Sequence, residues 1–198
     1  MGRKSLAAER KTDILNAFEQ CILERGIEGT SFQHIAQVLG MDRKMVSHYF
    51  GNREALVDAM TQRIVGDFNA RMNEATANLA PSMDVMELVD AFYDEQHCTE
   101  EIEILWAEIL AYATRSEAVR GCLRQSYDKM LQSVGEAIKQ EYPSAPTRQF
   151  QAAVYTVTIL LDRASTFEWL GVKGSPIKDA KAAIKEVLRS LEGSIEEK

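Results

Sequence analysis

Apolar residues recur along almost the whole chain at intervals of three and four positions, the spacing that places them on one face of an α-helix. No alternation typical of a β-strand persists beyond a few residues, and the four prolines fall where helices are expected to begin or end. The pattern predicts an all-α protein of about nine helices. Its clearest apolar stripe comprises Ile14, Ala17, Phe18, Cys21 and Ile22.

That stripe predicts a first helix over about 7–25, which Gly26 ends in a left-handed conformation. Two short helices are expected between Thr30 and Phe50, and Asn52 is expected to cap a fourth helix over about 53–79. Further helices are predicted over about 84–97, 100–114, 117–141, 147–171 and 177–194. We therefore divide the chain into a three-helix head, residues 1–52, and a helical body, residues 53–198.

Residues 30–50 of the head have the pattern of a helix-turn-helix, in which the second helix enters the major groove of DNA. Two short amphipathic segments flank a tight turn at 40–42, and the side chains of Ser31 and Asp42 can each accept a backbone N–H at the start of a helix. The predicted apolar faces comprise Phe32, Ile35, Ala36 and Leu39 in the first segment and Val46 and Phe50 in the second.

The remaining sides of the second segment carry residues that could contact DNA. Arg43 and Lys44 are candidates for guanine O6 and N7, and Met45 could pack on a thymine methyl or partly into the core. Ser47 and His48 could reach bases or phosphates. The ring of His48 could instead pack, exposed, against its neighbour.

Thr30 and Ser31 are further candidates for DNA contact. They precede a helix N-terminus, where free N–H groups attract phosphate. Arg3, Lys4, Arg10 and Lys11 form either a basic arm for DNA or a solubilising tail.

The head resembles the TetR family of bacterial repressors over roughly residues 12–60. The matching positions are Thr30-Ser31, Ile35-Ala36, Gly40, His48-Tyr49-Phe50 and Asn52-Arg53-Glu54-Ala55-Leu56. The resemblance implies that Tyr49 and Arg53 contact phosphate. It also implies a homodimer that binds a palindromic operator and is released by a small-molecule effector. The chain departs from the family pattern at Asp42, Lys44, Ser47 and Arg53, so no operator sequence carries over.

Residues 152–161 of the body, AAVYTVTILL, are apolar nearly all round. Such a helix is buried on more than one side, and the simplest second partner is another copy of the chain. TetR relatives pair through their last two helices, and the resemblance assigns this role to the predicted helices over 147–171 and 177–194.

The tetrapeptide Ser47-His48-Tyr49-Phe50 also resembles the BetI branch of the family, whose members respond to choline. Aromatic residues and carboxylates of the body could cage such a cation, or the aromatic residues could belong to the core. Asp162, within the apolar run, could instead pair with Arg163 of the partner subunit or hydrogen-bond across the dimer seam. The candidate ligand-binding residues are Tyr93, Trp106, Tyr112, Asp162 and Trp169.

The net charge of −7 lies entirely outside the first 60 residues, where 8 Lys/Arg balance 8 Asp/Glu. Because phosphate attraction is screened beyond about 10 Å, an acidic body is compatible with a DNA-binding head. No apolar run approaches the roughly 18 residues of a membrane helix, and no signal peptide is evident. These features predict a cytoplasmic, nucleoid-associated regulator.

Two other classes of protein compete with that interpretation. One is a helical adaptor that binds only protein. The other is a di-metal carboxylate enzyme, for which Asp94 and His97 have the right spacing but lack a second carboxylate–histidine pair. No cofactor motif is visible. Cys21 is expected to be a buried thiol, and Cys98 or Cys122 could sense redox state.

Overall fold

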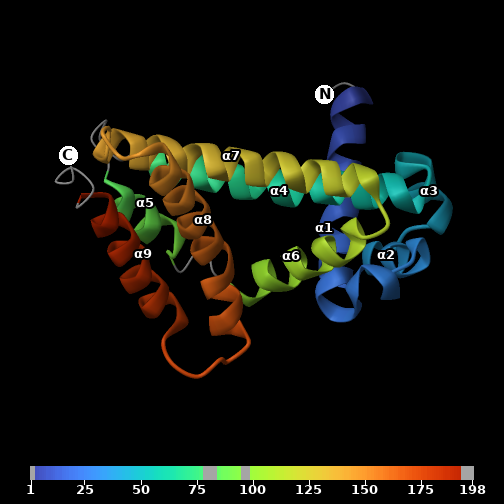
Figure 1. Cartoon of the computed structure of the whole chain (residues 1–198). Helices are drawn as coiled ribbons and strands as arrows, with labels where there is room; N and C mark the ends of the chain where they lie inside the picture. Colours follow the sequence, from blue (N-terminus) through green and yellow to red (C-terminus); the bar gives the residue numbers. More distant parts are fainter. Residues whose placement is uncertain (1–2, 78–83, 95–98, 193–198) are drawn as a thin grey trace. The chain divides into compact units, whose positions relative to one another are not determined.

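The computed structural model describes residues 3–77, 84–94 and 99–192, with backbone alone at 3–5 and 71–77. These described residues form nine α-helices and no β-strand, which confirms the predicted all-α class (Figure 1). None of the described helices has both the length and the apolar character needed to cross a membrane. Packing divides the chain into two compact units, Met1–Asp67 with Ile104–Leu123 and Phe68–Glu103 with Arg124–Lys198.

The first unit is built around one apolar core that joins the N-terminal helices to later parts of the chain. The predicted stripe of the first helix is confirmed, since all five of its residues are at most 2% exposed. The elements of the first unit are α1 (Arg3–Gly29), α2 (Phe32–Leu39), α3 (Arg43–Phe50), the first part of α4 (Arg53–Ala77), most of α6 (Glu100–Ala113) and the start of α7 (Glu117–Glu141).

This division by packing differs from a division at residue 52. Leu56 of α4, Ile109 of α6 and Leu123 of α7 are buried in the same cluster as Phe18 and Val46. The apolar faces of α1 to α3 are therefore covered partly by segments far along the chain.

The second unit has its own core, in which α8 and α9 pack along each other. Val157 and Leu161 of α8 and Ile184 of α9 are almost fully buried in it. The elements of the second unit are the end of α4, α5 (Val85–Phe92), the start of α6, most of α7, α8 (Thr147–Trp169) and α9 (Pro176–Glu192).

The predicted bounds of α7 are confirmed at both ends, and those of α6, α8 and α9 agree within two residues where they are described. The prediction of a helix over 84–97 is wrong in length, because α5 ends at Phe92. Tyr93 leaves the helical conformation at φ −94° and ψ 19°, and its hydroxyl donates to Leu160 O at 2.7 Å. Residues 95–97 lie outside the described part.

The predicted break at Gly26 is confirmed, although helical structure resumes after it within α1. Gly26 has φ 71° and ψ 169°, a conformation that is essentially restricted to glycine. The N–H of Ile27, which the break releases from the helix, donates to the Glu108 carboxylate at 2.8 Å. The Thr30 hydroxyl donates to Gly26 O at 2.9 Å. Side chains thus satisfy the backbone at the break.

Replacing Gly26 with alanine should lower the free energy of unfolding by about 1–3 kcal/mol. The positive φ disfavours any Cβ, and an added Cβ would lie 2.8 Å from Glu108 Oε1, the carboxylate that holds Ile27. The measurement is urea unfolding followed by circular dichroism.

The matched control is Gly66→Ala, inside α4, where an added Cβ meets nothing within 4 Å. That change should raise stability by about 0.5–1 kcal/mol, because alanine favours a helix interior. Equal effects of the two substitutions would contradict the special role of the Gly26 conformation.

Candidate nucleic-acid interface

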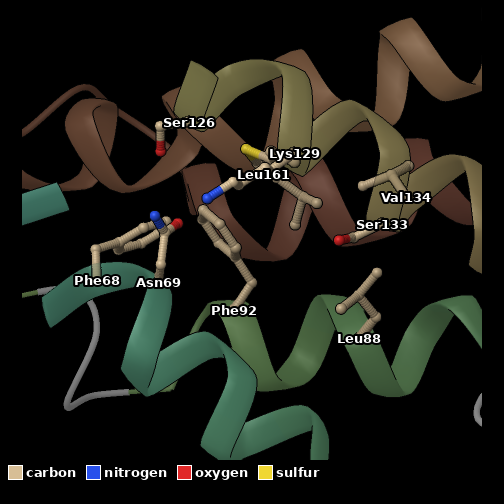
Figure 2. A pocket seen from close by; sticks show the side chains of 10 residues that line it. Phe68, Asn69, Leu88, Phe92, Ser126, Lys129, Ser133, Val134 and Leu161 are labelled. Atoms are coloured by element: carbon tan, nitrogen blue, oxygen red, sulfur yellow. The ribbon is translucent and has the colours of Figure 1, made fainter. Parts of the chain in front are cut away.

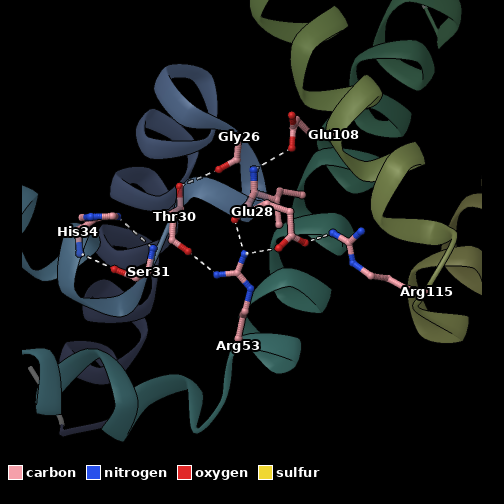
Figure 3. A network of polar contacts seen from close by, with 9 residues as sticks. Gly26, Glu28, Thr30, Ser31, His34, Arg53, Glu108 and Arg115 are labelled. Atoms are coloured by element: carbon pink, nitrogen blue, oxygen red, sulfur yellow. Dashed lines mark hydrogen bonds and ion pairs between the residues drawn. The ribbon is translucent and has the colours of Figure 1, made fainter.

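The connection into α2 is held by a reciprocal cap (Figure 3). The Ser31 hydroxyl accepts the His34 N–H at 3.3 Å, and the Ser31 N–H donates to His34 Nδ1 at 3.3 Å. This confirms the predicted cap and adds His34 as its second half. At the other end of α2, Gly40 adopts φ 61° and ψ 33°, and the Met41 N–H donates to Ala36 O at 2.9 Å. Together these contacts set the sharp turn into α3.

The cap at the start of α3 and its buried apolar residues together fix the rotation of this helix about its own axis. The Asp42 carboxylate accepts the Lys44 N–H at 2.7 Å, which confirms the predicted cap and directs the negative charge into the helix terminus. Val46 is fully buried and Phe50 is half-buried against the core, as the apolar pattern predicted. The opposite side of α3 is consequently presented outward.

That outward side is cationic and uncompensated. Arg43 and Lys44 are exposed, and no carboxylate among the described residues lies within ion-pair distance of either. Because the energetic cost of bringing phosphate to a cation is lowest when no internal partner must be displaced, both side chains are available to a polyanion such as DNA.

The other predicted contacts on α3 differ in exposure. Met45 is 42% exposed, so its side chain lies mainly outside the core. The His48 and Tyr49 rings meet edge to face with centroids 5.3 Å apart, while His48 stays exposed and Tyr49 is half-buried. The exposed Ser47 hydroxyl donates to Gly51 O at 3.4 Å. The packing alternative for His48 is therefore observed, and the ring still faces solvent.

Two of the residues predicted to contact phosphate have partners within the chain, and their contact with DNA stays a prediction. Thr30 is 2% exposed, and its hydroxyl already donates to Gly26 O at 2.9 Å. The Arg53 guanidinium donates to the backbone oxygens of both Ile27 and Thr30 and lies 3.8 Å from the Glu28 carboxylate. Arg53 thus holds the α1–α2 connection in place (Figure 3).

The same network contains residues that sequence reasoning missed. Glu108 accepts the Ile27 N–H, and Arg115 forms an ion pair with Glu28, which also faces Arg53. These partners are 81 and 87 residues apart in the chain, so no local spacing could have indicated them.

The proposed basic arm is partly engaged within the first unit. Arg10 pairs with Asp13 at 3.4 Å, and the Lys11 ammonium lies 5.8 Å from the centre of the Phe50 ring. The side chains of Arg3 and Lys4 lie outside the described part, so the arm stays a prediction.

The five candidate ligand residues are divided between the two units. Trp106 and Tyr112 belong to the first unit, where Tyr112 is buried in the core. Tyr93, Asp162 and Trp169 belong to the second, where Tyr93 is buried and Trp169 is 39% exposed at the end of α8. Core packing, the alternative interpretation, therefore describes Tyr93 and Tyr112.

Asp162 has two partners within its own chain, and the contact across a dimer seam stays a prediction. The Tyr127 hydroxyl donates to Asp162 Oδ1 at 3.0 Å, and Arg163 Nε lies 3.0 Å from Oδ2. Burial raises the pKa of Asp162, against the opposing influence of Arg163 and of the Tyr127 hydrogen bond. Burial, reinforced by the Asp162 charge, raises the pKa of Tyr127 to about 12, so the phenol keeps the proton that it donates.

The described residues contain no group of three or more His, Cys, Asp or Glu side chains arranged to hold a metal ion. His97 and Cys98, two residues of the competing metal and redox hypotheses, lie outside the described part. Cys21 is buried as predicted, and that burial raises the pKa of its thiol. Cys122 is half-buried, and neither described cysteine is in a disulfide.

Comparison with known proteins agrees with this geometry. Residues 14–60 match the family model for bacterial regulatory proteins of the tetR family. The transcriptional regulator BetI of Burkholderia mallei is 24% identical over 180 residues, covering 89% of this chain and 88% of that protein.

Solved structures share the fold at low identity. A TetR transcription regulator from Haloarcula marismortui superposes with a TM-score of 0.78 at 15% identity, covering 93% of this chain and 98% of its own. A candidate transcriptional regulator from Saccharomonospora viridis, solved in complex with choline, has a TM-score of 0.76 at 16% identity, covering 92% and 96%.

Replacing Arg53 with lysine should lower the free energy of unfolding by about 1–3 kcal/mol, because a single ammonium nitrogen cannot occupy both positions from which the two guanidinium nitrogens donate to Thr30 O and Ile27 O. Urea unfolding without DNA measures the effect. Arg43→Lys, on the exposed face of α3, should change stability by less than about 0.5 kcal/mol. An Arg53→Lys protein of wild-type stability that binds DNA poorly would contradict this structural role and support the predicted phosphate contact.

Replacing Lys44 with alanine should weaken binding to duplex DNA by about 1–3 kcal/mol, since an exposed, unpaired cation on α3 is removed. A gel-shift titration at fixed salt, with an oligonucleotide selected by the wild-type protein, measures the loss. Lys173→Ala removes an equal charge from an exposed site in the second unit and should leave affinity unchanged. Equal affinities of the two variants would refute the role of Lys44.

Proposed function

The chain belongs to the TetR family of bacterial transcriptional regulators, and from that premise we propose that it is a homodimeric repressor, released from a palindromic operator by a small-molecule effector. As a member of this family it is a DNA-binding regulator and not an enzyme. The observation that carries the proposal is the capped, rotationally fixed α3 with Arg43 and Lys44 exposed and unpaired within the described residues. A protein that binds chromosomal DNA acts in the cytoplasm, at the nucleoid.

Dimerisation is supported by the apolar surface of α8. Tyr155 is 62% exposed and Ile159 is 45% exposed, four residues apart on one helical face. Large apolar side chains gathered in this way favour a protein partner. A second copy would supply it through α8 and α9, the helices that the family resemblance assigns to pairing.

The dimer matters because a single helix-turn-helix reads only a short half-site. Two copies related by a twofold axis can read two half-sites about 34 Å apart, so the operator mirrors the symmetry of the protein. The departures at Asp42, Lys44 and Ser47 make an operator of its own sequence the natural expectation for this chain.

Release requires an effector that binds with different affinity to the DNA-competent and DNA-incompetent states. The α4 helix offers a covalent route for such coupling. Its first residue, Arg53, holds the α1–α2 connection, and its later residues Phe68 and Asn69 line a cavity in the second unit. The choline-bound relative makes a cationic ligand one candidate class.

Selection of bound sequences from a random duplex pool should return a palindrome with half-sites about 10 base pairs apart, and binding should weaken steeply with salt.

Tyr155→Glu should weaken self-association by about 2–4 kcal/mol, because it buries an unpaired charge in the dimer interface. Sedimentation equilibrium measures self-association and gel shifts measure DNA binding. Both should weaken together in the Tyr155→Glu protein.

The control Val38→Glu alters a side chain of α2 that is 51% exposed, and should leave the dimer intact. A wild-type protein that is monomeric at micromolar concentration would overturn the dimer. Indifference to every duplex pool would leave the protein-binding adaptor as the better interpretation.

A further inference from the structure

The second unit contains a cavity of about 130 Å³ among α4, α5, α7 and α8 (Figure 2). A closed apolar cavity of roughly 150 Å³ accepts a benzene molecule, so this volume suits a small organic ligand. None of the five ligand residues expected from the sequence lines it.

One part of the cavity wall is apolar and aromatic. Phe68 of α4 and Phe92 of α5 meet edge to face with ring centroids 5.8 Å apart, and Leu88, Val134 and Leu161 continue the surface. This wall suits a flat or branched hydrocarbon body, because it offers van der Waals contact and no competing polar group.

The other part of the wall is polar. Ser126, Lys129 and Ser133 follow one another at intervals of three and four along α7, and Asn69 of α4 joins them. Within the described part of the chain, none of these four side chains has a hydrogen-bond or ion-pair partner. Ser126 is only 7% exposed as a residue, and it lines the cavity with a hydroxyl that is unpaired among the described residues.

The charge of this polar part decides which ligand it favours. Lys129 supplies a full positive charge, while the hydroxyls and the Asn69 amide can all donate hydrogen bonds. No described residue lining the cavity carries a carboxylate. Figure 2 shows the Lys129 side chain extending from α7 toward Asn69 and Phe92. A cation placed here would face Lys129 without a compensating anion, whereas a carboxylate would gain a charge-assisted hydrogen bond.

We propose that the effector of this chain is a small organic acid with an apolar body, bound in this cavity. Its hydrocarbon part packs on Phe68 and Phe92, its carboxylate meets the Lys129 ammonium at the exposed edge, and the Ser126 hydroxyl donates to it from within. The inference rests on the proposed function as a ligand-released regulator. It replaces the aromatic–carboxylate cage for a cation with a site of opposite charge.

The test compares ligands that share one body and differ in charge: 3-phenylpropanoate, 3-phenylpropanol and 3-phenylpropylamine, with choline as a fourth probe. Calorimetric titration of the full chain at constant ionic strength should give the order anion, then alcohol, then cation. The carboxylate should bind about tenfold or more tightly than the alcohol, as expected for a hydrogen bond between charged groups.

Two variants locate the site. Lys129→Met keeps most of the length of the side chain without its charge, and should cost the anion about tenfold in affinity while leaving the alcohol unchanged. Lys185→Met, on the exposed surface of α9, is the matched control and should alter neither. Ser126→Ala should weaken the anion more than the amine.

Tighter binding of choline or the amine, an anion affinity that ignores Lys129→Met, or no binding by any probe would each overturn the proposal. Operator binding measured on the same protein separates this failure from failure of the proposed function. A protein that selects a palindrome but ignores the acid keeps its regulatory role and loses this site. A protein that binds the acid but no DNA loses the regulatory role instead.

Discussion

The arrangement of the DNA-reading helices depends on satisfying the backbone where α1 breaks. Leaving a helix at Gly26 frees N–H and carbonyl groups in a half-buried region, and an unpaired buried group of this kind costs about 1–3 kcal/mol. Glu108 takes the Ile27 N–H, and Arg53 takes two carbonyls. Side chains of α6 and α4 therefore determine where α2 begins, and α3 follows from the turn at Gly40.

The same constraint separates cations that look alike in the sequence. Arg43 and Arg53 are ten positions apart in one basic, helical region, yet one is exposed and unpaired within the described residues and the other is committed to backbone oxygens. The carbonyls released near Gly26 attract the guanidinium that lies within reach. An acidic chain can therefore present a cationic face locally, where exposed cations such as Arg43 and Lys44 have no carboxylate partner among the described residues.

Several features that depend on neighbours within about four residues were predicted correctly, as expected from the short range of capping and helical periodicity. The caps at Ser31 and Asp42, the turn at Gly40 and both ends of α7 are examples. Contacts set by tertiary packing were not, and the Arg53–Ile27 bond joins residues 26 apart.

The proposed ligand cavity shows a second limit of prediction from the sequence. Aromatic side chains such as Tyr112 serve a core as well as a pocket, so residue type alone could not distinguish the two. The sequence did not indicate Ser126 and Lys129 as ligand-binding residues. They line the cavity only because the fold brings α7 beside α4 and α5.

The shared core of the first unit has a practical consequence for protein engineering. Ile109 and Leu123 bury against the same cluster as Phe18, so a fragment ending after residue 52 would lack part of its own interior. Transplanting the DNA-binding helices onto another scaffold would require carrying over α6 and the first turns of α7. A shorter graft would expose an apolar, aggregation-prone surface to water.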